Sequence, residues 1–191
     1  MTGKNSKELH YFITRLTNFP AEFLENAEVI SIKKWDINPT GWPILKTKGL
    51  ELECFAANQD EFPKQGETIQ IQLSNNYQDI KPISEQNKNI LRDKNATYNK
   101  YILSGKIVHI FEPEYTTFNI ETNNLGKTVL KKKLRTRIEK NPLIILDCGV
   151  FVKVAGIKKP EMGKWVEVGG RMDAEVDYRS FQTEFKTSGG K

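Results

Sequence analysis

The strongest constraint on the fold is a two-residue alternation near the C-terminal end, over residues 164–178, with Trp165 and Gly169 as exceptions. One parity is mostly apolar and the other carries mainly Glu, Arg and Asp. Successive side chains of a β-strand point to opposite faces, so this pattern predicts a half-buried strand. The adjacent glycines Gly169 and Gly170 predict a bend or β-bulge in its middle. The apolar parity comprises Val166, Val168, Gly170, Met172, Ala174, Val176 and Tyr178.

The same period recurs along the chain. It predicts strands over residues 28–35, 49–56, 67–73, 101–111 and 116–122. A nearly continuous apolar run over 143–155 predicts a central strand that is covered on both faces. Segments rich in Pro, Gly and Asn separate these runs and predict tight turns.

Helix signals are few. Residues 20–26 predict a short turn of helix that begins with Pro20, and residues 84–94 predict a second helix with Ser84 as its N-cap. The polar stretch 75–100 is otherwise the best candidate for a linker. These patterns predict a mainly β, antiparallel protein with one or two short helices, and an α+β arrangement is the alternative.

The composition bounds the class of protein. The chain has 191 residues, and its 10 Phe, 6 Tyr and 3 Trp argue against general disorder. No apolar run approaches the ~18 residues that span a bilayer, and the first residues lack the apolar core of a secretory signal. The two cysteines, Cys54 and Cys148, lie in apolar stretches, which favours a reduced setting. We therefore expect a cytoplasmic protein with no membrane partner.

The positive charge is concentrated in the second half of the chain. Residues 1–96 carry 12 basic and 13 acidic residues, whereas residues 97–191 carry 17 and 11. The length allows one large domain or two small ones. We expect an N-terminal β-rich region over 1–96, with a separate small barrel as one option. A basic β-barrel region over 97–185 and a flexible tail over 186–191 would follow.

The basic segment 126–140 is the main candidate for function, and its pattern is ambiguous. Leu130, Leu134 and Ile138 have the spacing of an amphipathic helix, but the segment also alternates. Turns bracket it, so we favour a strand that pairs with 116–122 on one side and with 143–155 on the other. Seven cations cluster here, opposed only by Glu139: Lys127, Lys131, Lys132, Lys133, Arg135, Arg137 and Lys140.

The strand interpretation has a consequence for ligand binding. Residues i and i+2 of a strand lie ~6.5–7 Å apart on one face, which is close to the phosphate spacing of an extended single strand of nucleic acid. A cation row of Lys127, Lys131, Lys133, Arg135 and Arg137 could therefore follow a phosphate backbone, and binding would depend on salt. Candidate stacking partners for the bases are Phe111, Tyr115, Phe118, Phe151 and Trp165. The predicted nucleic-acid-binding residues are Lys127, Lys131, Lys132, Lys133, Arg135, Arg137, Lys164 and Trp165.

Two phrases carry a resemblance to a known fold. Residues 163–171 (GKWVEVGGR) resemble a late strand of the OB-fold nucleic-acid-binding β-barrels, and residues 104–108 (SGKIV) resemble a first OB strand. The resemblance covers about 101–178 and implies an OB-like barrel whose groove takes single-stranded nucleic acid. A second option is a barrel that starts at residue 28, with the predicted 84–94 helix linking its later strands.

Catalytic signals are weak. The two histidines, His10 and His109, are far apart in the sequence, and no nucleophile motif is present. Asp173, Glu175 and Asp177 share a strand face, but a solvated charged face is the better interpretation. We therefore expect no enzyme activity, no catalytic residue, no metal site and no cofactor. The expected function is binding of single-stranded DNA or RNA, and the alternative is a structural subunit that docks on an acidic protein partner through the basic hairpin.

Overall fold

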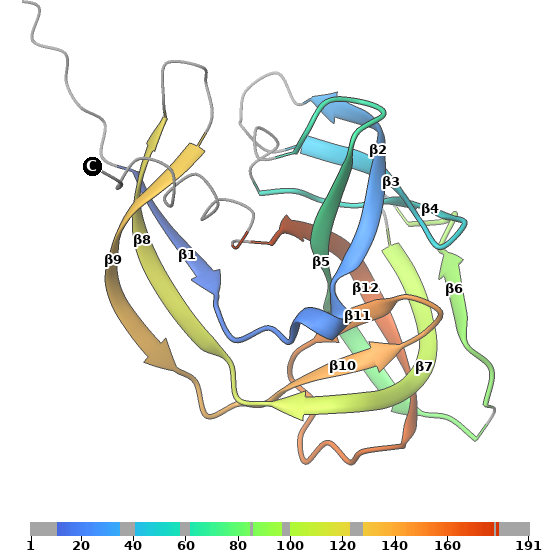
Figure 1. Cartoon of the computed structure of the whole chain (residues 1–191). Helices are drawn as coiled ribbons and strands as arrows, with labels where there is room; N and C mark the ends of the chain where they lie inside the picture. The colour runs from blue at the N-terminus through green and yellow to red at the C-terminus, as the bar shows by residue number, and fades with distance from the viewer. Residues whose placement is uncertain are drawn as a thin grey trace, which may run out of the picture.

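The computed structural model describes residues 11–34, 41–57, 62–84, 86–96, 100–122, 128–177 and 179. This part of the chain contains a short 3-10 turn, η1 (Ala21–Phe23), and the mainly β class is confirmed (Figure 1). The strands are β1 (Tyr11–Leu16), β2 (Glu25–Lys34), β3 (Gly41–Thr47), β4 (Leu50–Glu53), β5 (Thr68–Pro82), β6 (Asn89–Arg92), β7 (Lys100–Phe111), β8 (Glu114–Thr122), β9 (Thr128–Ile138), β10 (Leu143–Asp147), β11 (Phe151–Val154) and β12 (Trp165–Val176).

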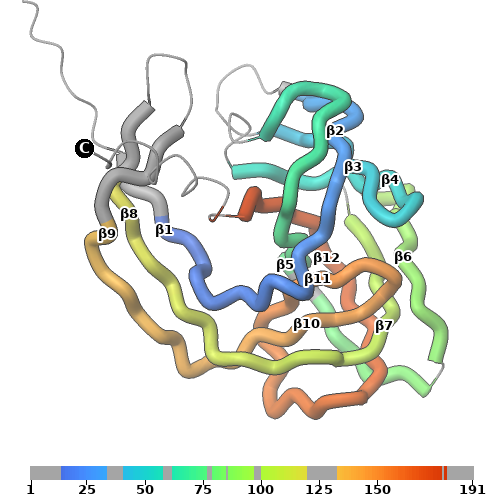
Figure 2. The backbone as a smooth tube through the Cα atoms, in the orientation of Figure 1, coloured from blue at the N-terminus to red at the C-terminus, as the bar shows by residue number. Residues whose placement is uncertain are grey.

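Nine strands form the larger sheet, in the order β11-β10-β7-β12-β5-β2-β3-β4, with β6 paired to β7. Five of them close a ring, because β11 returns to pair with β5 in parallel, with Val152 opposite Leu73. The other strand pairs in the described residues are antiparallel. The tube of Figure 2 shows β10 and β11 running beside β7 and β5 in this ring.

The long strands β5 and β12 connect the ring to the rest of the sheet. They pair from Val166 opposite Pro82 to Val176 opposite Ile71. Beyond β4, the N–H of Phe55 donates to the carbonyl of Met172 (2.8 Å), and the N–H of Ala174 donates to Phe55 (2.9 Å). Strands from both halves of the sequence therefore share one sheet and one main hydrophobic core.

The remaining strands form a three-stranded sheet in the order β1-β8-β9. Figure 1 shows this sheet curving away from the nine-stranded sheet, with β9 at its outer edge. Its base is held by a second hydrophobic cluster that includes Leu16, Phe19, Leu143 and Ile145. The arrangement leaves β9 with one partner strand among the described residues.

Burial follows the sequence alternation closely. In β12 every second residue is buried, from Val166 to Val176, and the register against β5 shifts between Gly169 and Gly170, as the glycine pair predicts. In β10 both faces are covered, because Ile144 and Leu146 belong to the main core while Leu143 and Ile145 belong to the second cluster.

Two predictions, one of a strand and one of a linker, need correction. Residues 143–155 form a hairpin, β10 and β11, rather than one strand. The turn forms because the carboxylate of Asp147 accepts the N–H of Gly149 (3.2 Å), and Gly149 adopts a φ of 108° that favours glycine. The linker predicted over 75–100 is also wrong, because β5 continues to Pro82 and stays paired with β12.

The helix predictions fare differently. The helix over 84–94 is wrong, because residues 89–92 form β6, which pairs with β7 from Asn89 opposite Ser104 to Arg92 opposite Tyr101. The free edge of β7 supplies backbone partners that local propensity does not reveal. The helix over 20–26 is reduced to η1, which begins directly after Pro20. The flexible tail predicted for residues 186–191 lies outside the described residues, as does Tyr178.

A search of the described residues for a helix long and apolar enough to cross a membrane finds none.

Candidate nucleic-acid interface

The basic segment is a strand, as its alternation predicts. β9 pairs with β8 along its length, from Glu114 opposite Ile138 to Thr122 opposite Thr128. The hydroxyls of Thr116 and Thr136 hydrogen-bond across the pair (3.1 Å). The predicted pairing with residues 143–155 is wrong, because β10 pairs with β7 and β11 in the other sheet.

Six consecutive residues of β9, 133–138, are exposed. Arg137 pairs with Glu139 (2.9 Å) and lies over the ring of Tyr115, with its guanidinium carbon 5.6 Å from the ring centre. Lys133 and Arg135 have no ion-pair partner among the described residues. Their charges therefore face solvent, where they are free to meet an anion.

Two bulges interrupt the predicted cation row. The β8–β9 register shifts between Thr117 and Phe118, and again between Asn119 and Ile120. Directly opposed residues of an antiparallel pair share a face. Arg135 lies opposite Thr117 and Arg137 opposite Tyr115, so these two arginines share a face, whereas Lys133 lies opposite Phe118 and falls on the other.

The structure describes only part of the predicted row. Lys127 lies outside the described residues, and for Lys131 and Lys132 the structure describes the backbone alone.

Lys164 and Trp165 are not brought to β9. Trp165 begins β12 in the nine-stranded sheet, opposite Lys106 of β7. Its side chain is half-buried and lies on the face of β12 opposite to the buried residues. Lys164 is exposed and its ammonium lies 3.6 Å from the carboxylate of Glu161. The predicted binding residues that the structure describes thus fall into two groups, one on β9 and one at the start of β12.

Most of the candidate aromatics serve packing. Phe118 is buried. Phe111 and Phe151 pack on the second cluster, where Phe151 meets the ring of Phe23 at 5.0 Å. Tyr115 is only partly buried and lies under the guanidinium of Arg137, whereas Phe118, which lies opposite Lys133, is buried.

Tyr115 sits where the two sheets meet. Burial raises the pKa of its hydroxyl, and the nearby carboxylates Glu139 and Glu175 raise it further. The residue also lines a small cavity of about 160 Å³, together with Asn75, Lys153 and Asp173 of the nine-stranded sheet. Burial raises the pKa of Asp173, although Arg171 opposes this through two hydrogen bonds of 2.6 and 2.9 Å.

Sequence reasoning did not consider one aromatic group on the outer face of the larger sheet. Trp42 and Phe55 meet edge to face at 5.3 Å, and the guanidinium of Arg171 lies 4.1 Å above the ring of Phe55. The one indication in the sequence was that Arg171 lies among the charged residues of β12, on the face opposite to its buried residues. Two isolated bridges bring these residues together, Gly41 to Ala56 for Trp42 and Phe55, and Phe55 to Asp173 for Arg171, and the sequence pattern reveals neither.

Two carboxylates and both thiols that could carry chemistry are paired or buried. Among the described residues, no three His, Cys, Asp or Glu side chains cluster as metal ligands. Asp173 and Asp177 are paired with Arg171 and Arg179. Both cysteines are buried, and burial raises the pKa of Cys148 to about 12, so its thiol stays protonated near neutral pH.

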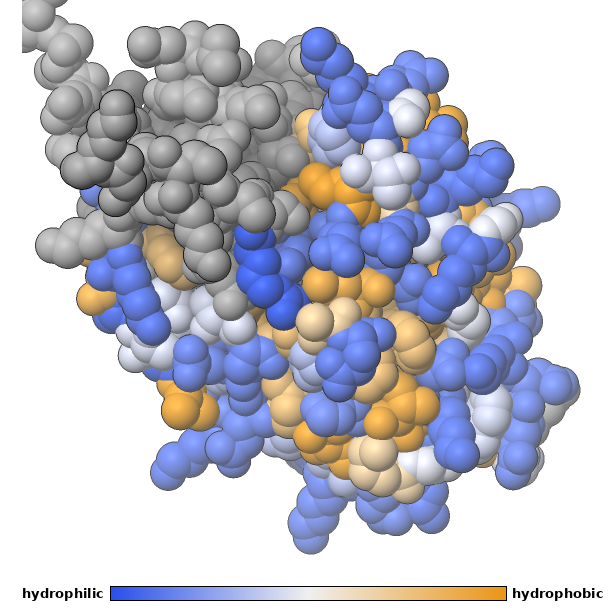
Figure 3. Space-filling view, in the orientation of Figure 1, coloured by the Kyte–Doolittle hydropathy of each residue, from blue (hydrophilic) through white to orange (hydrophobic). Residues whose placement is uncertain are grey.

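On the face shown in Figure 3, hydrophilic side chains cover most of the described surface and apolar ones show in separate patches. Comparison of the chain with family models, with curated proteins and with solved structures finds no match in any of the three. The function must therefore be argued from the residues themselves.

Proposed function

We propose that this is a non-catalytic nucleic-acid-binding protein that takes single-stranded DNA or RNA on β9. The observation that carries the proposal is the pair Arg135 and Arg137, which are exposed on β9 and share one face of the β8–β9 pair with Tyr115 of β8. Two arginines at i and i+2 lie ~6.5–7 Å apart, so they can contact successive phosphates. Tyr115 offers a ring beside them on which a base can stack.

The fold that goes with this function is an OB-like barrel built from β5, β12, β7, β10 and β11. An OB barrel has five strands, and the two strands that carry the resemblance, β7 and β12, are neighbours in the ring. The arrangement departs from the resemblance in two respects. β5 precedes the residues 101–178 that the resemblance covers, and β8 and β9, which fall within that range, lie outside the ring in the three-stranded sheet.

The test is fluorescence anisotropy with labelled single-stranded and double-stranded oligonucleotides over a salt series. We expect the single strand to bind more tightly and the affinity to fall as salt rises. Arg135→Glu should weaken binding and make the salt dependence shallower by about one phosphate contact. The matched control is Lys64→Glu, the same charge change at an exposed loop residue away from β9. Absence of binding at low salt would refute the proposal.

Trp165→Ala tests whether the second group of predicted residues takes part. A stacked base is worth about 1–3 kcal/mol, so loss of such a contact would weaken binding at least several-fold. Unchanged binding would restrict the interface to the three-stranded sheet.

One observation favours the alternative, a subunit that docks on an acidic protein partner. Leu134 and Ile138 are 46% and 64% exposed on β9, and apolar residues at a strand edge are typical of a protein interface. Under this alternative the oligonucleotides do not bind. A complex with the partner would be lost in both Arg135→Glu and Ile138→Asp, with the isolated protein unchanged.

A further inference from the structure

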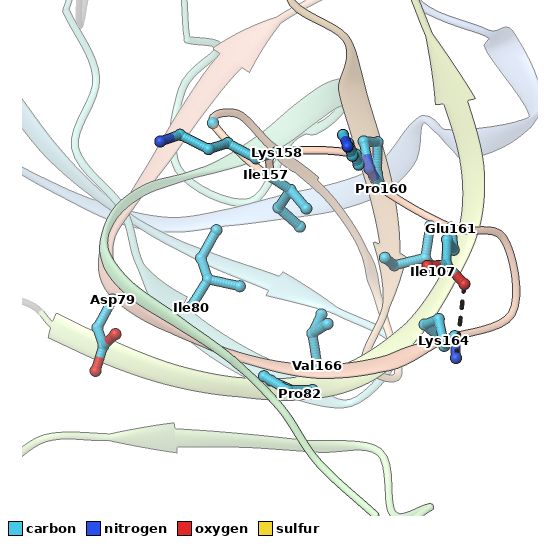
Figure 4. A pocket seen from close by; sticks show the side chains of 12 residues that line it. Asp79, Ile80, Pro82, Ile107, Ile157, Lys158, Pro160, Glu161, Lys164 and Val166 are labelled. Carbon is cyan, nitrogen blue, oxygen red and sulfur yellow. Dashed lines mark ion pairs between the residues drawn. The ribbon is translucent and has the colours of Figure 1, made fainter.

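A pocket larger than the cavity beside Tyr115 lies away from β9, at one end of the five-stranded ring. Its volume is about 590 Å³, and it is formed where the loop 155–164 lies against residues of β5, β7 and β12. Figure 4 shows Ile80, Ile157 and Val166 pointing into this space from three different segments, with Ile107 beside them. Pockets of ~300–1,000 Å³ with an apolar lining are typical of small-molecule sites.

The floor of this pocket is aliphatic. Ile107 and Val166 are buried members of the main core, and Ile80 and Ile157 pack against the same core while staying partly exposed. The residues that line the pocket include no aromatic side chain and no arginine. The site therefore offers no stacking surface for a planar ring, and its chemistry suits a flexible hydrocarbon chain.

The rim of the pocket is cationic. Lys158, Lys159 and Lys164 line it, against Asp79 and Glu161. Lys164 is engaged with Glu161 at 3.6 Å, whereas Lys158 and Lys159 are exposed and have no ion-pair partner in the described part of the chain. In Figure 4, Lys158 and the Lys164–Glu161 pair stand on opposite sides of the opening. Three ammonium groups against two carboxylates leave a net single positive charge.

The backbone of the rim points to a role for one of these lysines. Lys159 has a φ of 52°, a left-handed conformation that disfavours residues with a side chain and that glycine adopts readily. Backbone strain of this kind is found at ligand sites, where a side chain is kept despite its cost.

We propose that this pocket binds a medium-chain aliphatic carboxylate. The hydrocarbon chain would lie over Ile80, Ile157 and Val166, and the carboxylate would meet the ammonium groups of Lys158 and Lys159 at the rim. A singly charged head group matches the net charge of the rim better than a phosphate dianion does. The site shares no residue with β9, so it does not depend on the proposed nucleic-acid binding.

The test is calorimetric titration of the full-length protein with octanoate, decanoate and dodecanoate, each below its micelle concentration. Burial of each added methylene should tighten binding about three- to fourfold until the pocket is full. Decanol, which has the chain without the charge, should bind more weakly than decanoate, and so should decyl phosphate. In amide NMR spectra the shifts should concentrate at Gly156 and Val166.

Three variants separate the parts of the site. Lys159→Gly removes the charge while suiting the left-handed backbone, so the fold should persist and decanoate should bind about two- to fivefold more weakly. Ile157→Ser should reduce the gain in affinity from each added methylene. Arg135→Ala on β9 removes the same charge elsewhere and should leave the affinity unchanged.

Four results would overturn the proposal. The first is absence of saturable binding at millimolar decanoate, and the second is an affinity that does not depend on chain length. The third is an equal loss in Arg135→Ala and Lys159→Gly, which would mean that only the overall charge matters. If decyl phosphate binds more tightly than decanoate, the assignment of a carboxylate is wrong.

Discussion

Replacing Gly105 with alanine should destabilise the ring, because β7 and β10 approach too closely for a side chain. A Cβ atom added at Gly105 would lie 2.5 Å from the carbonyl oxygen of Asp147 and 2.9 Å from its carbonyl carbon. It would also lie 3.0 Å from Cγ of Leu146. The obstacle is mainly backbone, so relief requires β10 to shift from β7 near the pairs that hold the two strands together.

The size of the effect follows from the crowding. Forcing one extra carbon into a packed core costs typically about 1–3 kcal/mol. For a chain of this length, each kcal/mol lowers the melting temperature by about 2–4 °C. We therefore expect Gly105→Ala to lower the midpoints of thermal and urea unfolding clearly, without changing the dependence on urea concentration.

The matched control is Gly169→Ala. This glycine also lies in a strand of the ring, in β12 opposite Ile102. The nearest atom that its added Cβ would meet is Cε of Lys100 at 3.7 Å, an ordinary contact. Alanine there should be neutral, or stabilise by up to about 1 kcal/mol by restricting the unfolded chain. If the two variants prove equally stable, the close approach of β7 and β10 is wrong.

Three further predictions concern burial. Burial raises the pKa of Cys148 to about 12 from an ordinary value of 9.0, so its contribution to stability is present below pH 9 and lost between pH 9 and 12. The free energy of unfolding, measured with urea, should therefore fall with rising pH in this range. The fall should be less steep in Cys148→Ala than in wild type, by up to roughly 1.4 kcal/mol per pH unit. The buried carboxylate of Glu25 accepts from Lys48 (2.8 Å) and from a backbone N–H (2.7 Å), so Glu25→Gln should lower the free energy of unfolding by about 2 kcal/mol. Ile138 is 64% exposed, so Ile138→Thr should change stability by less than about 0.5 kcal/mol, and a larger loss would mean that β9 is covered.

The parts of the fold that the sequence predicted well are those where side chains report their own environment. The alternation in β12 identifies its buried face, because each residue from Val166 to Val176 on that parity packs in the core. The Gly169–Gly170 pair predicts the bulge, because only these residues lack side chains to hold a regular pleat there. Both faces of β10 are covered, as its continuous apolar run predicts.

The failures occur where the partner strand determines the structure. Residues 89–92 have a helical composition, yet they form β6 because β7 has an edge to offer. The turn within residues 143–155 could not be recognised in the apolar run, because Gly149 has Cys148 before it and apolar residues after it. Closure of the ring by β11 and β5 joins residues about 80 positions apart (Val152 and Leu73), and no local pattern encodes such a pairing.

At the candidate site, too, pairing with the partner strand determines which face each side chain takes, and this can be tested by measurement. Counting by twos along β9 places Lys133, Arg135 and Arg137 on one face, but the bulge opposite Thr117 and Phe118 moves Lys133 to the other. A single strand of nucleic acid that follows one face should therefore contact both arginines and miss Lys133. For single strands, each phosphate contact contributes about 0.7 to the slope of log affinity against log salt. Arg135→Ala and Arg137→Ala should each make the slope shallower by about that amount, and Lys133→Ala should leave it unchanged. Equal effects of all three variants would mean that the bound strand follows the edge of β9 rather than one of its faces.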